Sequence, residues 1–153
     1  LYGKTNEDAV RCDMLVGAVG DFNVPAMQFT FKADKDEASR DLDESLKKFG
    51  KNFEFILTQN EGEFLVGQKL SVADIIMAES LTSFIEFSPT CLNNYPLLKQ
   101  LQEKVVSEHN INEYLNSSNR WRLPDEQYVI DIARVLCRPL PSHMPEPNRF
   151  VKG

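Results

Sequence analysis

A serine followed three residues later by an aspartate, Ser71 and Asp74, is the pattern in this sequence that first suggests chemistry. An acid in such a place is either a catalytic group or one half of a helix cap. In the cap, the Ser71 hydroxyl accepts a hydrogen bond from the Asp74 N–H, and the Asp74 carboxylate accepts one from the Ser71 N–H. Leu70 and Ile75 flank the pair at the positions of a hydrophobic staple. We therefore interpret Ser71 and Asp74 as the structural cap of a buried helix.

A second acid, Asp21, falls on the same helical stripe as Val10, Met14 and Gly17. An acid in line with apolar residues is a paired buried group, part of a functional site, or a solvated side chain where the stripe ends. The residues alone leave these alternatives open.

Met27 and Phe31 lie one helical turn apart and continue a face with Val24. Taken alone, a Met–Phe pair at this spacing indicates ordinary core packing. Gly17 and Gly20 would allow another backbone to approach closely, either at a dimer contact or in packing within the chain.

The sequence offers no pattern for metal or redox chemistry. His109 and His143 have no neighbouring ligand-type residues, and Trp121 lies between two arginines without a catalytic context. The three cysteines are Cys12, Cys91 and Cys137, and none stands in a CxxC spacing. We therefore predict no metal and no cofactor. Three thiols, an odd number, favour a reducing compartment, and we expect the cytoplasm.

Composition narrows the class of protein further. The chain has 153 residues, which suits one domain, with 42% hydrophobic and 26% charged residues. A net charge of −6 gives no basic face for nucleic acid or anionic membranes. No apolar run approaches the roughly 18 residues that span a bilayer. We expect neither nucleic acid nor a membrane as a partner.

Helical periodicity runs through most of the chain, and no alternating pattern predicts a sheet. One helix is expected from Thr5 as N-cap to about Lys32, with two apolar stripes that should both be covered. We expect Gly50, within the second helix, to destabilise that helix only slightly. The fold class is all-α, an irregular bundle around the third helix. The expected later helices lie at about 37–59, 71–87, from 96, 111–115 and from 124, followed by a proline-rich tail.

Five segments together resemble one known family. The stretch "FLVGQKLSVAD" at residues 64–74 resembles the capping box and staple in the C-terminal helical domain of cytosolic glutathione transferases. "LYGKT" at residues 1–5 looks like their interdomain junction, and "VRCDMLVGAVGDF" at 10–22 like their first helical segment. "NNYPLLKQLQEKV" at 93–105 and "INEYLNSS" at 111–118 look like two later helices. The resemblance covers about residues 1–124 and suits the alpha/mu/pi/sigma group.

The resemblance implies roles for individual residues. In the family, an aspartate in the place of Asp21 reaches across the dimer to the amino group of glutathione on the other subunit. Residues in the places of Met27 and Phe31 line the pocket for the hydrophobic acceptor substrate. The activating tyrosine or serine belongs to a thioredoxin-like N-terminal domain. No strand pattern of that domain precedes Leu1, so we expect this chain to match the second domain only.

The implied activity is conjugation of glutathione, as co-substrate, to hydrophobic electrophiles, in a protein that is a homodimer when complete. This chain alone is expected to be inactive. The alternative is a non-catalytic relative, either a crystallin-like protein or an assembly module of a translation complex. Residues 125–153 extend beyond compact members of the family. The amphipathic helix of this extension could cover the acceptor pocket, pack elsewhere on the domain or dock on a partner.

Overall fold

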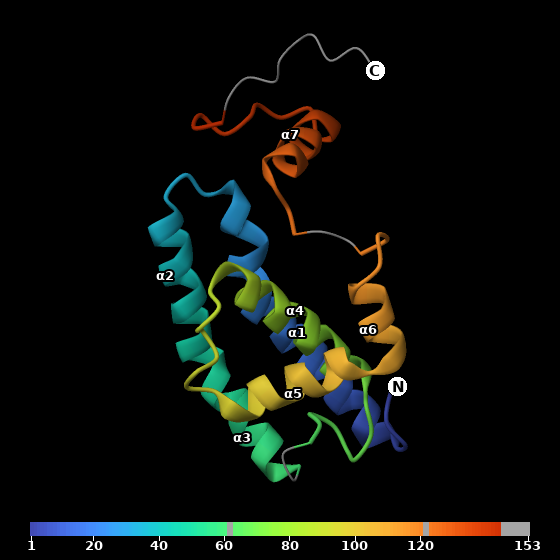
Figure 1. Cartoon of the computed structure of the whole chain (residues 1–153). Coiled ribbons are helices and arrows are strands. Elements are labelled where there is room, and N and C mark those ends of the chain that lie inside the picture. The colour runs from blue at the N-terminus through green and yellow to red at the C-terminus, as the bar shows by residue number, and fades with distance from the viewer. Residues whose placement is uncertain (61–62, 121–122, 145–153) are drawn as a thin grey trace.

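The computed structural model describes residues 1–60, 63–120 and 123–144 (Figure 1). Within these residues the chain is helical and contains no strand. The elements in chain order are α1 (Asn6–Gln28), the 3₁₀ turn η1 (Phe29–Phe31), α2 (Lys35–Ser45), the π-helical turn η2 (Leu46–Gly50), α3 (Lys51–Gln59), α4 (Val72–Phe87), α5 (Pro96–Ser107), α6 (His109–Leu115) and α7 (Glu126–Val135).

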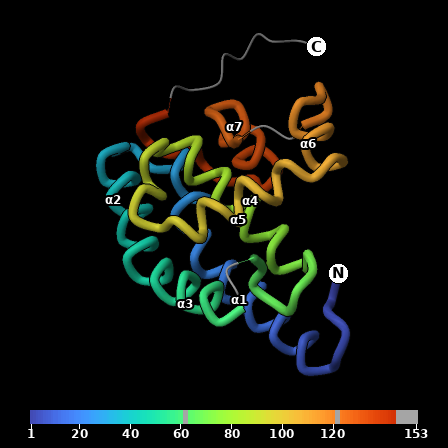
Figure 2. The backbone as a smooth tube through the Cα atoms, turned by 60° about the horizontal axis from the view of Figure 1, so that its bottom comes forward, coloured from blue at the N-terminus to red at the C-terminus, as the bar shows by residue number. Residues whose placement is uncertain are grey.

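Helix α4 is the centre of the bundle and packs between α1 and α5 (Figure 2). Phe22 stacks on Phe84 with 4.4 Å between ring centroids, and Phe29, just after α1, stacks on Phe87 at the end of α4 at 4.0 Å. The two helices therefore run in the same direction. The predicted all-α bundle around this helix is confirmed. The buried residues of α4 are Ala73, Asp74, Met77, Ala78, Ser80, Leu81 and Phe84.

Two exposed helix starts are capped by their own side chains. Thr5 and Asp8 form a capping box at α1, where the Asp8 N–H donates to Thr5 Oγ1 over 3.1 Å. At α2, the side chain of Asp34 accepts hydrogen bonds from the N–H groups of Glu37 and Asp36. The Glu37 N–H, followed by that of Asp36, lowers the pKa of Asp34 because both bonds favour the charged carboxylate.

The prediction that both apolar stripes of α1 are covered is wrong for this chain. Leu15, Val19 and Phe22 are buried, but Val10 is 58% exposed and Met14 is 70% exposed. None of the described segments packs over the second stripe. Periodicity predicts that a face is apolar but does not predict what covers it, and here the face is open. Helix α1 ends at Gln28, and the last predicted turn is the 3₁₀ turn η1.

The helix expected after residue 36 is continuous but changes its winding at η2, between α2 and α3. Gly50 ends this turn and is buried, contrary to the prediction of a merely tolerated glycine. A Cβ atom built at Gly50 would lie 2.5 Å from Cε1 of Tyr95, far inside van der Waals contact. Glycine is therefore needed because the Tyr95 ring packs directly on the backbone.

Helix α7 lies at the end of the molecule opposite α3 and packs against η1 (Figure 1). Thr30 Oγ1 donates a 2.7 Å hydrogen bond to the carbonyl oxygen of Pro124, and the rings of Phe31 and Tyr128 meet edge to face at 6.2 Å. The helix starts at Glu126, two residues after the proline expected to open it, because Asp125 is its N-cap. The end of the predicted proline-rich tail, from residue 145, lies outside the described residues.

Candidate functional site

Ser71 and Asp74 form a capping box at the start of α4, and both side chains are enclosed. Asp74 Oδ2 accepts from the Ser71 N–H at 2.7 Å and from the Ser71 hydroxyl at 2.6 Å. Asp74 Oδ1 accepts from the Leu65 N–H at 2.7 Å, which joins the preceding loop to the helix. Burial raises the pKa of Asp74, while the hydrogen bonds act in the opposite direction. Both carboxylate oxygens accept hydrogen bonds from within the chain, as expected for an acid that caps a helix.

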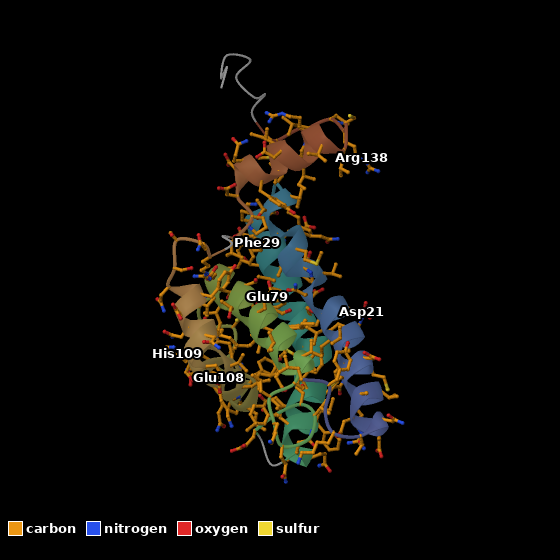
Figure 3. All side chains as sticks on the ribbon, turned by 90° about the vertical axis from the view of Figure 1, so that its right-hand side faces the viewer. Asp21, Phe29, Glu79, Glu108, His109 and Arg138 are labelled. Carbon is orange, nitrogen blue, oxygen red and sulfur yellow. The ribbon has the colours of Figure 1, made fainter. Side chains whose placement is uncertain are left out.

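A groove of about 540 Å³ lies on another side of α4, between α1, α6 and the segment that leads to α7. In Figure 3, Glu79 of α4 marks this side of the molecule between α1 and α6. The walls are mostly apolar. The lining residues are Asn23, Ala26, Met27, Ile75, Ala78, Glu79, Thr82, Ser83, Glu86, Val105, Val106, Asn110, Ile111, Tyr114, Leu115, Arg120, Leu123 and Pro124.

The structure separates the two predicted acceptor-pocket residues. Met27 lines the groove, and the residue is 61% exposed. Phe31 is not among the groove-lining residues and instead contacts Tyr128 of α7. The spacing of one turn is interrupted by the change from α1 to η1, which directs Phe31 to α7. That either residue binds an acceptor substrate stays a prediction.

Sequence reasoning missed the contribution of α4 to the groove. Ile75, Glu79, Thr82 and Glu86 recur every three or four residues and therefore share one face of the helix. The two acids could have indicated this open face, because a fully buried central helix would not carry Glu79 and Glu86 on one side. The strongly apolar sequence of the rest of the helix obscured it.

Of the described charged side chains that line the groove, two form an ion pair with each other and one does not. Glu86 of α4 pairs with Arg120, which ties the segment before α7 to the central helix. Glu79 has no ion pair with any residue in the described part of the chain. The groove walls partly remove water from its carboxylate and so raise the pKa of Glu79.

Asp21 lies on the exposed side of α1, away from the groove (Figure 3). It makes no hydrogen bond or ion pair with the residues that the structure describes. A Cβ atom at Gly17 or at Gly20 would meet no atom within 4 Å, so this part of α1 is open surface. Asp21 is thus accessible to a molecule outside the chain, and its role in glutathione binding stays a prediction.

None of the remaining candidates within the described residues lines the groove. Cys12 is buried and Cys137 is exposed. Cys91 is half-buried, and burial, with a smaller contribution from the Asp43 charge, raises the pKa of its thiol to about 11. His109 is exposed at the start of α6. Trp121 lies outside the described residues.

No helix within the described residues has the length and apolar character needed to cross a membrane. The same residues hold no cluster of three or more histidine, cysteine, aspartate or glutamate side chains placed to bind a metal ion.

Comparison with known proteins gives consistent matches. The family model described as "Glutathione S-transferase, C-terminal domain" matches residues 20–118. Glutathione S-transferase P 2 of Bufo bufo is 32% identical over 126 residues, and glutathione S-transferase A1 of Bos taurus is 31% identical over 137 residues. These alignments cover 81% and 88% of this chain but only 60% and 62% of the relatives, so the chain spans about three-fifths of their length.

The fold also matches a solved structure. Monomeric Na-GST-3, a glutathione S-transferase from the hookworm Necator americanus, superposes with a TM-score of 0.70 at 22% sequence identity. The match covers 76% of this chain and 60% of the hookworm chain.

Proposed function

Because this chain belongs to the glutathione S-transferase family, as its C-terminal domain, we propose that the complete protein conjugates glutathione to apolar electrophiles. In this proposal a preceding thioredoxin-like domain activates the glutathione thiol. The described chain contributes the acceptor groove and supports a homodimer. The groove between α1, α4 and α6 is the single observation that carries the proposal.

The size and walls of the groove suit an apolar small molecule. Small-molecule sites typically enclose about 300–1,000 Å³ and combine apolar walls with a few polar groups. The groove has about 540 Å³, and Ile75, Ala78 and Ile111 are among the residues that line it. An electrophile bound there would be held by contact area, while the reacting thiolate would be supplied by the preceding domain.

Asp21 is proposed to bind the amino group of a glutathione held by the other subunit. A carboxylate that faces an ammonium group forms a charge-assisted hydrogen bond, which is stronger than a neutral one. The open surface around Gly17 and Gly20 leaves room for a second subunit to approach this part of α1.

We propose that the chain alone is inactive. The nucleophile in the reaction is the thiolate, and a thiol of ordinary pKa is mostly protonated at neutral pH. The buried start of α4 is already occupied by Asp74 and Ser71, so it offers no free donor to stabilise a thiolate. We also propose a cytoplasmic location, because the three cysteines are free thiols.

A substitution at the rim of the groove tests the proposal. Met27→Trp, in the complete protein, should narrow the groove and raise KM for a bulky aromatic acceptor while KM for glutathione stays constant. Gln28→Trp is the matched control, because Gln28 is the exposed neighbour on α1 and does not line the groove. Equal acceptor KM values in the two variants would place the acceptor site elsewhere.

A further inference from the structure

Most polar groups on the groove walls already have partners. The Thr82 hydroxyl donates to the carbonyl oxygen of Ala78 at 2.7 Å and accepts from Gln102 Nε2 at 3.1 Å. The Ser83 hydroxyl donates to the carbonyl oxygen of Glu79 at 3.3 Å. These side chains therefore have little remaining capacity to select a ligand.

Asn23 and Glu79 carry two of the acceptor groups that have no partner in the described part of the chain. Asn23 Oδ1 is enclosed and accepts no hydrogen bond. The Glu79 carboxylate forms no hydrogen bond or ion pair with the residues of 1–60, 63–120 and 123–144. The enclosed Asn23 Oδ1 without a donor is unfavourable, and a donor on a bound molecule would relieve it. Glu79 is exposed to solvent, so its carboxylate is free to meet such a donor. Asn23 of α1 and Glu79 of α4 both line the same groove.

The charge of the walls further restricts the ligand. Glu86 and Arg120 neutralise each other, so Glu79 supplies an uncompensated negative charge among the described lining residues. A neutral hydroxyl could donate to Asn23, but it would not balance this charge. A protonated amine supplies several N–H donors and the opposite charge in one group.

We propose that the groove selects an apolar molecule that carries a single protonated amine, with Glu79 and Asn23 Oδ1 as the acceptors for its N–H groups. The inference rests on the proposed function, because it takes the groove to be the acceptor site and specifies the class of molecule that enters it. The aromatic or aliphatic body of the ligand packs against Ile75, Ala78 and Ile111. Glu79 and Asn23 act as specificity-determining residues and take no part in the conjugation step.

Binding of a matched pair of probes to the 153-residue chain tests this inference. Phenylbutylamine carries the amine, and pentylbenzene has nearly the same shape without it. Isothermal titration calorimetry gives the dissociation constant of each. Glu79→Gln should weaken binding of phenylbutylamine about three- to tenfold, because a charge-assisted hydrogen bond is lost at a partly solvated site. The same variant should leave pentylbenzene binding unchanged.

Two further variants complete the experiment. Asn23→Leu should weaken phenylbutylamine binding while Asn23→Asp, which keeps an acceptor of the same shape and adds charge, should strengthen it. Glu103→Gln is the charge-matched control, because Glu103 is an exposed acid of α5 that does not line the groove. It should change neither dissociation constant.

The outcomes separate the inference from the proposed function. If pentylbenzene binds and Glu79→Gln does not alter phenylbutylamine binding, the amine selectivity is refuted and the apolar acceptor groove stands. If Glu103→Gln weakens phenylbutylamine binding as much as Glu79→Gln does, the attraction comes from the overall charge and the inference also fails. If neither probe binds the wild-type chain, both the inference and the acceptor groove are refuted.

Discussion

Removing the Asp74 carboxylate should destabilise the chain more than any other single change at a helix cap. Asp74→Ala leaves the N–H groups of Leu65 and Ser71 buried without an acceptor. Each orphaned donor costs about 1–3 kcal/mol. Loss of a buried charge offsets part of this, because burial raises the pKa of Asp74 and disfavours its ionised form. The net expected loss in the free energy of unfolding is about 2–4 kcal/mol.

The loss can be read from urea denaturation followed by far-UV circular dichroism. With an m-value of about 2 kcal/mol/M, Asp74→Ala should lower the urea midpoint by about 1–2 M. Asp74→Asn retains one acceptor oxygen, so its urea midpoint should lie between those of the wild type and Asp74→Ala. Ser71→Ala leaves the N–H groups of Leu65 and Ser71 paired with Asp74 and removes the acceptor only of the Asp74 N–H, so its effect should be the smallest of the three.

The cap of α1 provides the matched control. Asp8 also accepts two backbone N–H groups in a capping box, but these hydrogen bonds are exposed to solvent. Water can therefore replace the lost acceptor in Asp8→Ala, and its midpoint should fall less than that of Asp74→Ala. A midpoint for Asp74→Ala equal to or above that of Asp8→Ala would refute the claim that burial makes the α4 cap important.

Three further predictions concern other parts of the chain. Gly50→Ala should lower the free energy of unfolding by about 1–3 kcal/mol, because its methyl group overpacks against Tyr95. Urea denaturation should show a smaller loss when the same change is made in a Tyr95→Leu background. The folded pKa of Asp34 is lowered, so its stabilisation is complete above about pH 4 and is lost as the pH falls through that folded pKa. Asp34→Asn should therefore flatten the decline of the midpoint below about pH 4, and an unchanged decline would exclude the cap as its source. Iodoacetamide should modify the exposed Cys137 well before the half-buried Cys91. The raised pKa of Cys91, about 11, leaves about a hundredfold less thiolate than a thiol of ordinary pKa has. Comparable modification rates by mass spectrometry would contradict this.

The fold was largely predictable because it depends on local signals. The 3.6-residue periodicity predicted the helices, and Ser71 with Asp74 predicted the start of the central one. The N-cap at Asp125 was missed because Pro124 gave a competing start signal two residues earlier.

Long-range contacts account for the features that the sequence did not predict. The need for glycine at position 50 comes from Tyr95, which is far away in the chain. The start of α5 is held by Glu54 of α3, whose Oε1 accepts from the Leu98 N–H at 2.8 Å. Neither contact has a local pattern, because each depends on how the helices are placed against one another.

The groove was predicted only in part for the same reason. Met27 could be carried over from the family resemblance, but the face of α4 with Glu79 could be recognised only once α1 and α6 were in position. Phe31 was carried over from the same resemblance but does not line the groove. The change in winding at η1 directs its ring to Tyr128 instead.

Conjugation of glutathione to a generic aromatic electrophile, with the uncatalysed rate subtracted, is the most direct test of the proposed function. The assay compares the 153-residue chain with a longer protein that includes a thioredoxin-like domain before Leu1. We expect the longer protein to be active and the 153-residue chain to show no rate above the uncatalysed reaction, because we propose that the thiolate is formed by the preceding domain. Conjugation by the 153-residue chain at a rate comparable to that of the longer protein would contradict the proposal that this chain supplies the acceptor groove while another domain activates the thiol.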